Sequence, residues 1–283
     1  MWRSLLFIPT LAERFVEKAA TRGADAIILD LEASIAAERK SEARLALPKA
    51  VENLTTDVSV TVRINPLWLD AIRDLEACVL PGVQAVHMAL CENVAHVQAV
   101  DGIISELEEQ RGLPAGEIKL VAMIESAAAL ERATDIAEAS PRMIGMTLGV
   151  EDYATSMGVS AAPDLLRPAV FQLNQAARAA GIASFGVPVS MADYQDTERL
   201  EAEAQYARRL GTTGGYAVHP AQVAILNAVF EPAAEEIAWA TEVLAGAKEA
   251  QMRAEGVFKV RGQMIDQPLI FRAERIMATV SKL

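Results

Sequence analysis

The sequence is poor in cysteine, and it has neither a block of basic residues nor a long apolar run. Cys78 and Cys91 are its two cysteines, and their spacing fits neither a metal site nor a dense disulfide framework, so we expect two reduced thiols. The opening segment, MWRSLLFIPT, has a four-residue apolar run that is too short for a signal peptide, and no later stretch approaches a membrane-spanning length. These absences favour a cytoplasmic protein without a membrane partner.

Charge excludes a second group of functions. The formal net charge is −12 and the pI is about 4.8, so acidic residues outnumber basic ones along the chain. Without a cluster of Lys and Arg, neither a nucleic acid nor an anionic membrane surface is expected as the main partner. A small anionic ligand stays compatible with this composition if positive charge is concentrated at its site.

A regular alternation of strands and helices is what the sequence has in abundance. Eight short apolar or β-branched runs predict strands, and they cover residues 5–8, 26–29, 58–64, 85–88, 120–124, 143–148, 182–189 and 216–218. Helical segments lie between them, and they cover residues 13–21, 36–53, 94–109, 127–138, 164–180 and 197–210. Eight strands with alternating helices predict an α/β fold of the (β/α)8 TIM barrel type. An open doubly wound sheet is the alternative, although no G-x-G-x-x-G follows the first strand.

The last part of the chain lies outside the eightfold pattern. After Phe230 the sequence predicts one long helix, a short strand-like piece with a glycine turn, and a final helix. With 283 residues, 52% of them hydrophobic, the chain is long enough for one large domain and an appendage. We therefore predict a barrel over residues 1–230 and a C-terminal helical extension over residues 231–283.

Polar residues at the predicted strand ends mark the reactive face of such a barrel. They are Asp30, Glu32, Arg63, Asn65, Glu125, Glu151, Asp152 and His219. One complete strand–helix–strand unit separates Glu125 from Asp152, so both carboxylates are expected to project from adjacent strand ends toward one spot. Two like charges repel each other unless a positive charge lies between them, and Mg²⁺ is the preferred candidate. The alternative is an ion pair with Arg63 and no metal.

These residues stand within motifs that give the chain a resemblance to a known family. The motifs are RSLLFIP, KAATRGADAIILDLE, VRIN, IKLVAMIESAAAL, LGVEDYATSMG, RLGTTGGYAVHPAQV and GQMIDQPLIFRAERI, in that order. Together they resemble the citrate lyase beta-subunit-like (CitE-like) branch of the HpcH/HpaI aldolase superfamily, near malyl-CoA and citramalyl-CoA lyases. The resemblance implies a (β/α)8 barrel that forms a homotrimer or hexamer, with the extension of one protomer packing on its neighbour.

The resemblance also assigns roles to individual residues. It implies that Glu125 and Asp152 bind Mg²⁺, and that Glu125 and Arg63 lie against the bound keto acid. Arg63 would stabilise the developing enolate, and Asp266, supplied by a neighbouring protomer, would act as the acid and base. Glu32 is expected to hold a water molecule of the metal site, or alternatively to pair with a nearby arginine.

Other strand-end residues are expected to be structural, and no Schiff-base lysine is predicted. Asp30 lies two residues before Glu32 on the same strand face, and His219 is expected to satisfy backbone groups. Lys18 and Lys40 are predicted to lie on helices, and Lys119 precedes its strand, so none of them stands at a strand end.

The sequence departs from the family pattern around the predicted substrate entrance. Ala33 replaces an acid, Thr10 replaces a glycine, and Ala89 and Leu90 stand where a Pro-Lys pair is common.

Three functions remain compatible with the sequence. The first is a Mg²⁺-dependent lyase of a short 3-hydroxyacyl-CoA, such as malyl-CoA or citramalyl-CoA, which yields a 2-keto acid and an acyl-CoA. The second is an aldolase on free hydroxy-keto acids, and the third is a catalytically silent metal- or CoA-binding subunit of a lyase complex.

Overall fold

The computed structural model describes residues 2–54, 58–66 and 68–280, and it divides the chain into two compact units. The first unit is Trp2–Phe230, and the second is Glu231–Leu283. Within the described residues, no helix is both long enough and apolar enough to cross a membrane.

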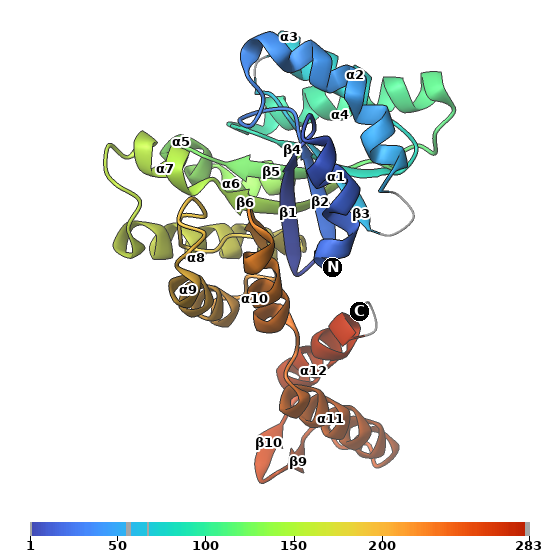
Figure 1. The fold of residues 1–283 in the computed structure, drawn as a ribbon. Coiled ribbons are helices and arrows are strands. Elements are labelled where there is room, and N and C mark those ends of the chain that lie inside the picture. Colours follow the sequence, from blue (N-terminus) through green and yellow to red (C-terminus); the bar gives the residue numbers. More distant parts are fainter. Residues whose placement is uncertain (1, 55–57, 67, 281–283) are drawn as a thin grey trace. The chain divides into compact units, whose positions relative to one another are not determined.

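Eight parallel strands form the centre of the first unit (Figure 1). They are β1 (Ser4–Pro9), β2 (Ala26–Asp30), β3 (Ser59–Ile64), β4 (Val83–Met88), β5 (Lys119–Ile124), β6 (Met143–Leu148), β7 (Ala183–Ser184) and β8 (Gly215–Ala217). Their order in the sheet is β7-β6-β5-β4-β3-β2-β1-β8, so neighbours in sequence are neighbours in space. The Thr213 N–H donates to the Ser184 carbonyl at 2.8 Å and joins the two ends of the sheet. The predicted (β/α)8 barrel is confirmed.

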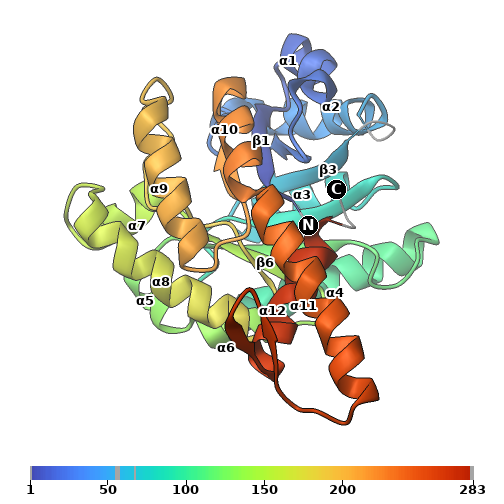
Figure 2. The same ribbon diagram turned by 90° about the horizontal axis from the view of Figure 1, so that it is seen from below.

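Helices surround these strands, as Figure 2 shows. The predicted segments form α1 (Glu13–Ala19), α2 (Lys40–Glu52), α4 (Val94–Arg111), α5 (Ala127–Glu131), α6 (Ala133–Ala137), α8 (Pro163–Ala179) and α9 (Thr197–Arg209). The 3₁₀ turns η1 (Ala20–Arg22) and η2 (Ala37–Arg39) adjoin α1 and α2. Three helices were not predicted from the sequence: α3 (Trp68–Cys78), α7 (Val150–Ser156) and α10 (Pro220–Phe230).

The seventh strand is shorter than the sequence predicts. The apolar run 182–189 predicts a strand of eight residues, but regular pairing covers Ala183 and Ser184, and the Phe185 N–H adds one more bond, to the Met146 carbonyl. Pro188 has no N–H to donate, and proline is unfavourable within a central strand. Residues 183–189 are buried, but most of them belong to the loop that leads to α9.

Two apolar layers stabilise the barrel, because its strands are buried on both faces. All five residues of β2, for example, are buried. The inner layer fills the barrel and includes Leu5, Ile28, Val121, Phe185 and Tyr216. The outer layer lies between strands and helices and is the larger of the two.

The second unit has its own core. It consists of α11 (Ala234–Met252), a hairpin of β9 (Phe258–Val260) and β10 (Gln263–Ile265), and α12 (Gln267–Val280). Arg261 and Gly262 form the hairpin turn with φ values of 49° and 81°, which explains the glycine there. The core residues are Ala240, Val243, Val260, Ile265 and Ala273.

Candidate metal and substrate site

Glu125 is the most constrained side chain at the carboxyl ends of the strands. It directly follows β5, is 5% exposed, and accepts a hydrogen bond of 2.7 Å from the Leu90 N–H to Oε2. Leu90 has a φ of 46°, a left-handed conformation that is uncommon for leucine. Gly149 lies beneath the carboxylate, and a Cβ added there would stand 2.6 Å from Oε1. The close approach of Glu125 therefore requires glycine at position 149.

Burial raises the pKa of Glu125 to about 7, and the negative charges of Asp152 and Glu32 contribute to this rise. The Leu90 N–H and the Arg63 guanidinium act in the opposite direction, but they do not cancel the effect. Asp152 lies in the first turn of α7, four residues after the end of β6, and its side chain is exposed. The structure thus brings Asp152 and Glu32 within electrostatic reach of Glu125.

The guanidinium group of Arg63 is contacted along its edge by carboxylates and on its face by an aromatic ring. Its Nε and Nη2 atoms donate to the two carboxylate oxygens of Asp30 at 2.7 and 2.8 Å, and Nη1 lies 3.1 Å from Glu32. The Phe7 ring lies against the face of the guanidinium, with 4.5 Å between Cζ and the ring centroid. Among the described residues, the ion pairs of Arg63 are with Asp30 and Glu32 rather than with Glu125.

Asp30 is the principal partner of this arginine and also orders the loop after β2. Its carboxylate accepts hydrogen bonds from the N–H groups of Glu32 and Ser34. Burial alone would raise the pKa of Asp30, but the Arg63 guanidinium and these donors hold it below its usual value. The structural role expected for Asp30 thus includes the orientation of Arg63.

Asn65 and Lys40 fix the backbone on either side of Glu32. The Asn65 side chain donates to the Leu31 carbonyl at 2.8 Å and to Asp74 at 2.6 Å. The Lys40 ammonium donates to the carbonyls of Leu31 and Glu32 at 2.8 and 2.5 Å. These backbone contacts give Lys40 a structural role, consistent with the expectation that it forms no Schiff base.

Thr10, one of the departures from the family pattern, also binds the loop region after β2. Its buried hydroxyl donates to the Asp30 carbonyl at 2.9 Å. Ala33, in the same loop, is exposed. Leu90 stands beside Glu125 with 38% of its surface exposed, so an apolar side chain occupies the position of a possible cation.

The carboxylates fit a hard cation, although they do not form a complete metal site. Within the part of the chain that the structure describes, no three His, Cys, Asp or Glu side chains gather in a way that could hold a metal ion. Glu125 and Asp152 together supply two carboxylates, and Mg²⁺ characteristically takes one or two from a protein and completes its shell with water and substrate oxygens. A buried carboxylate whose charge is opposed by neighbouring acids provides the electrostatic reason to bind such a cation.

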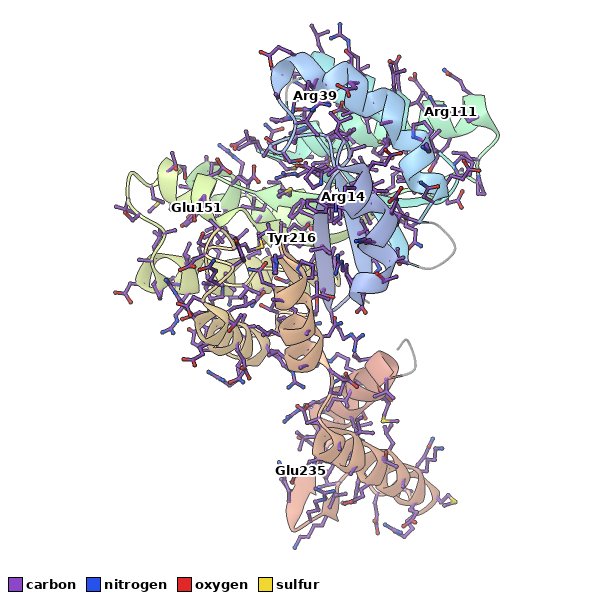
Figure 3. The ribbon with its side chains drawn as sticks, viewed as in Figure 1. Arg14, Arg39, Arg111, Glu151, Tyr216 and Glu235 are labelled. Atoms are coloured by element: carbon purple, nitrogen blue, oxygen red, sulfur yellow. The ribbon has the colours of Figure 1, made fainter. Side chains whose placement is uncertain are left out.

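The remaining predicted residues lie in less constrained surroundings. The side chain of His219 is exposed; its Nδ1 accepts from the Ala221 N–H, and its ring stacks on Tyr194 at 4.9 Å. Glu151 is exposed on α7, as Figure 3 shows. Asp266 is half-buried directly before α12 and belongs to the second unit, whereas Glu125 belongs to the first.

Two cavities adjoin the loops that follow β1 and β2. The larger, of about 500 Å³, runs along α1 and is lined by Leu11, Ala12, Glu13, Arg14, Phe15, Lys18 and Arg22. The smaller, of about 280 Å³, is lined by Pro9, Leu11, Ala12, Ser34, Ile35, Ala36 and Arg39. Figure 3 labels Arg14 and Arg39, one from each cavity. Three basic side chains therefore line the larger cavity, in an otherwise acidic protein.

Known proteins with similar sequences are lyases and lyase subunits. The sequence model of the HpcH/HpaI aldolase/citrate lyase family matches residues 3–220. The citrate lyase subunit beta of Leuconostoc mesenteroides subsp. cremoris is 34% identical over 279 residues, which are 97% of this chain and 92% of that protein. The L-malyl-CoA/beta-methylmalyl-CoA lyase of Cereibacter sphaeroides is 32% identical over 297 residues, covering 97% and 93% of the two chains.

Solved structures show the same fold. CitE of Mycobacterium tuberculosis, in complex with magnesium, acetoacetate and coenzyme A, superposes with a TM-score of 0.74 at 30% identity, over 97% of this chain and 96% of that one. The citrate lyase beta subunit of the same organism, complexed with oxaloacetate and magnesium, gives a TM-score of 0.68 at 28% identity, over 81% and 97% of the two chains.

Proposed function

The chain belongs to the HpcH/HpaI aldolase/citrate lyase family, and we propose that it is a Mg²⁺-dependent carbon–carbon lyase of a short 3-hydroxyacyl-CoA. Malyl-CoA and citramalyl-CoA are representative substrates, and the products are a 2-keto acid and an acyl-CoA. The observation that carries the proposal is the Glu125 carboxylate, whose ionised form is disfavoured by burial and further by Asp152 and Glu32, so that a bound cation would stabilise it.

Glu125 and Asp152 are the residues proposed to hold the metal. Mg²⁺, when bound, would act as a Lewis acid and as a template for the oxygen atoms of the oxyacid. The Leu90 N–H holds Oε2 of Glu125, and Oε1 lies over Gly149, so the carboxylate has little freedom to turn. This constraint lowers the entropy that the side chain must lose when a cation binds.

Arg63 is proposed to stabilise the enolate that forms when the carbon–carbon bond breaks. Asp30 fixes the edge of its guanidinium and Phe7 fixes its face, so the cation is oriented before the reaction begins. A preorganised charge at a developing anion is worth most in a site from which water is excluded. Glu32, which pairs with Arg63, is also proposed to hold a water molecule of the metal site.

Asp266 is proposed to exchange the proton of the enolate carbon in the active site of a neighbouring copy. It lies between β10 and α12, and its side chain is half-buried. This role requires a homo-oligomer, a trimer or a hexamer, in which the second unit of one copy packs on the barrel of the next.

The cavity along α1 is the proposed contact for the phosphates of the CoA group. Arg14, Lys18 and Arg22 line it together with the exposed ring of Phe15. Positive charge concentrated there is compatible with an anionic ligand even though the whole chain is acidic. The similar CitE protein binds coenzyme A, which supports CoA as the ligand class.

Two alternatives are kept because specific observations favour them. Leu90, half-exposed beside Glu125, replaces a lysine that is common in the family at the substrate entrance. The loss of this cation matters less if the substrate is a free hydroxy-keto acid and no CoA must bind. Several relatives are citrate lyase subunits, which favours a metal- or CoA-binding chain that acts within a larger complex. Cleavage of free acids, or ligand binding without cleavage, would identify these alternatives.

The test is a panel of hydroxyacyl-CoA thioesters and the corresponding free acids, with Mg²⁺ and a readout of released keto acid. Glu125→Ala is expected to abolish Mg²⁺ binding in calorimetry, whereas Asp266→Ala is expected to keep it and to stop turnover. Glu151→Ala, one residue from Asp152 on the same exposed turn, is the matched control and should change neither. Equal Mg²⁺ affinity of the wild type and Glu125→Ala would overturn the ligand assignment.

A further inference from the structure

A histidine inside the barrel is hydrogen-bonded at both ring nitrogens. His87, on β4, is fully buried; its Nδ1 lies 2.6 Å from the hydroxyl oxygen of Tyr216, on β8, and its Nε2 lies 3.0 Å from Oγ1 of Thr61, on β3. The Thr61 hydroxyl in turn donates to the Ile27 carbonyl of β2 at 3.0 Å. A continuous row of hydrogen bonds therefore crosses the barrel interior from β8 to β2.

The carbonyl at one end fixes the direction of the whole row. A carbonyl accepts but cannot donate, so the Thr61 hydrogen points at Ile27 and Oγ1 is left to accept from Nε2 of His87. In the neutral imidazole Nδ1 then carries no hydrogen, and Tyr216 is its donor. Burial and the nearby Arg63 charge lower the pKa of His87 to about 3, which keeps the ring neutral at ordinary pH.

The same tyrosine supports the ring that lies against Arg63. Tyr216 meets Phe7 edge-on, with 5.3 Å between ring centroids and 81° between planes. Phe7 lies against the Arg63 guanidinium at 4.5 Å, and Arg63 is aligned with His87 in the ladder of β3 and β4. Figure 3 shows Tyr216 near the strands, in the middle of the barrel unit.

We propose that His87 and Tyr216 are positioning residues for Arg63, an inference that rests on the proposed lyase function. The one-way row of hydrogen bonds fixes the Tyr216 ring, that ring fixes Phe7, and Phe7 supports the face of the guanidinium. Asp30 restrains the motion of the guanidinium within its plane. Phe7, which lies against its face, restrains its motion out of that plane. A cation must be held in both directions to meet the enolate in one orientation.

Tyr216→Phe tests the inference by removing a single oxygen atom. The expected result is a fall in kcat of roughly tenfold, with KM for the thioester and the affinity for Mg²⁺ unchanged, because Arg63 is misplaced while Glu125 is not. Tyr206→Phe, on the outer helix α9, is the matched control and should keep the wild-type kcat. A wild-type kcat for Tyr216→Phe contradicts the inference.

Two substitutions of His87 separate positioning from packing. His87→Leu removes both hydrogen bonds and is expected to lower kcat as far as Tyr216→Phe does. His87→Gln retains an acceptor for Tyr216 and a donor for Thr61, and is expected to recover most of the loss. A fall in kcat of the Gln variant equal to that of the Leu variant would contradict the role of the hydrogen-bond row.

Calorimetry with oxalate and Mg²⁺ gives a readout that does not require turnover, because oxalate is a planar dianion that resembles the keto acid. Tyr216→Phe is expected to weaken oxalate binding roughly tenfold while Mg²⁺ binding stays unchanged. If the wild type cleaves no thioester but this difference is found, the positioning inference stands and the lyase proposal fails. Equal oxalate affinity in both proteins overturns the inference.

Discussion

Replacing Glu125 by glutamine should stabilise the metal-free protein while it destroys the metal site. The pKa of this carboxyl is about 7 in the folded protein, against an ordinary value of 4.5. A raised carboxyl pKa means that the folded state binds the proton more tightly than the unfolded state. The resulting stabilisation is fully present below pH 4.5 and is lost as the pH rises through 7.

The size of the effect follows from this shift. At about 1.4 kcal/mol per pKa unit, this stabilisation has fallen by about 1 kcal/mol at pH 5 and by about 3 kcal/mol at pH 8, relative to its value at low pH. Glu125→Gln removes the charge and keeps an oxygen that can accept from the Leu90 N–H. In EDTA the variant should therefore exceed the wild type in free energy of unfolding, by an amount that grows between these two pH values.

The assay is urea unfolding in EDTA and in excess Mg²⁺, followed by the fluorescence of the three tryptophans, of which Trp2 and Trp68 belong to the barrel unit. In Mg²⁺ the wild type should gain stability, by about 2.7 kcal/mol at a concentration one hundred times Kd, and the variant should gain nothing. A difference between the two proteins that is absent, or constant from pH 5 to pH 8 in EDTA, would refute the electrostatic reasoning.

Three further substitutions test other contacts of the site. Gly149→Ala should weaken Mg²⁺ binding at least tenfold in calorimetry, because the new methyl group would displace Glu125. Asp30→Asn should lower the free energy of unfolding by about 3 kcal/mol and reduce kcat, because the buried Arg63 charge loses its main partner; urea unfolding and steady-state kinetics measure the two effects. Arg14→Ala should raise KM for CoA thioesters severalfold and leave Mg²⁺ affinity unchanged, as kinetics and calorimetry would show.

Matched variants make these outcomes specific. Gly102→Ala, where an added Cβ meets no atom within 4 Å, should leave Mg²⁺ affinity unchanged. Asp101 is the counterpart for Asp30, because it pairs with the buried Arg142 away from the candidate site, and Asp101→Asn should lower stability without a specific loss of kcat. If Arg14→Ala raised KM for free acids as much as for thioesters, the cavity along α1 would not be a CoA contact.

The strand pattern predicted most of the fold, and it placed Glu125 and Asp152 after two neighbouring strands. Glu125 and Asp152 follow consecutive strands, and consecutive strands are neighbours in this barrel. The short length of β7 was not predicted, because an apolar run does not show which of its N–H groups form hydrogen bonds with a neighbouring strand. The sequence did not predict the helix α7 either, so it placed Asp152 at a strand end, whereas Asp152 lies in the first turn of this helix.

The supporting contacts of the site could not be read from local sequence. Leu90 lies 35 residues from Glu125, and its left-handed backbone has no signature in the residue type. His87 and Tyr216 are 129 residues apart and meet because β4 and β8 both turn a side chain into the barrel. Gly149 belongs to the motif LGVEDYATSMG, but the need for glycine there follows from the position of Glu125 over it, which the motif does not show.

The distribution of charge favours a metal at this site over an arginine counter-ion. Arg63 is a cation among the strand-end carboxylates, yet its three donor groups point at Asp30 and Glu32. Its charge lowers the pKa of Asp30, whereas Glu125 is left with a pKa of about 7. If Arg63 neutralised Glu125, that pKa would lie below its ordinary value, as it does for Asp30. The pair of Glu125 and Asp152 therefore retains an unmet demand for positive charge, which a divalent cation would satisfy without drawing the arginine away from the enolate.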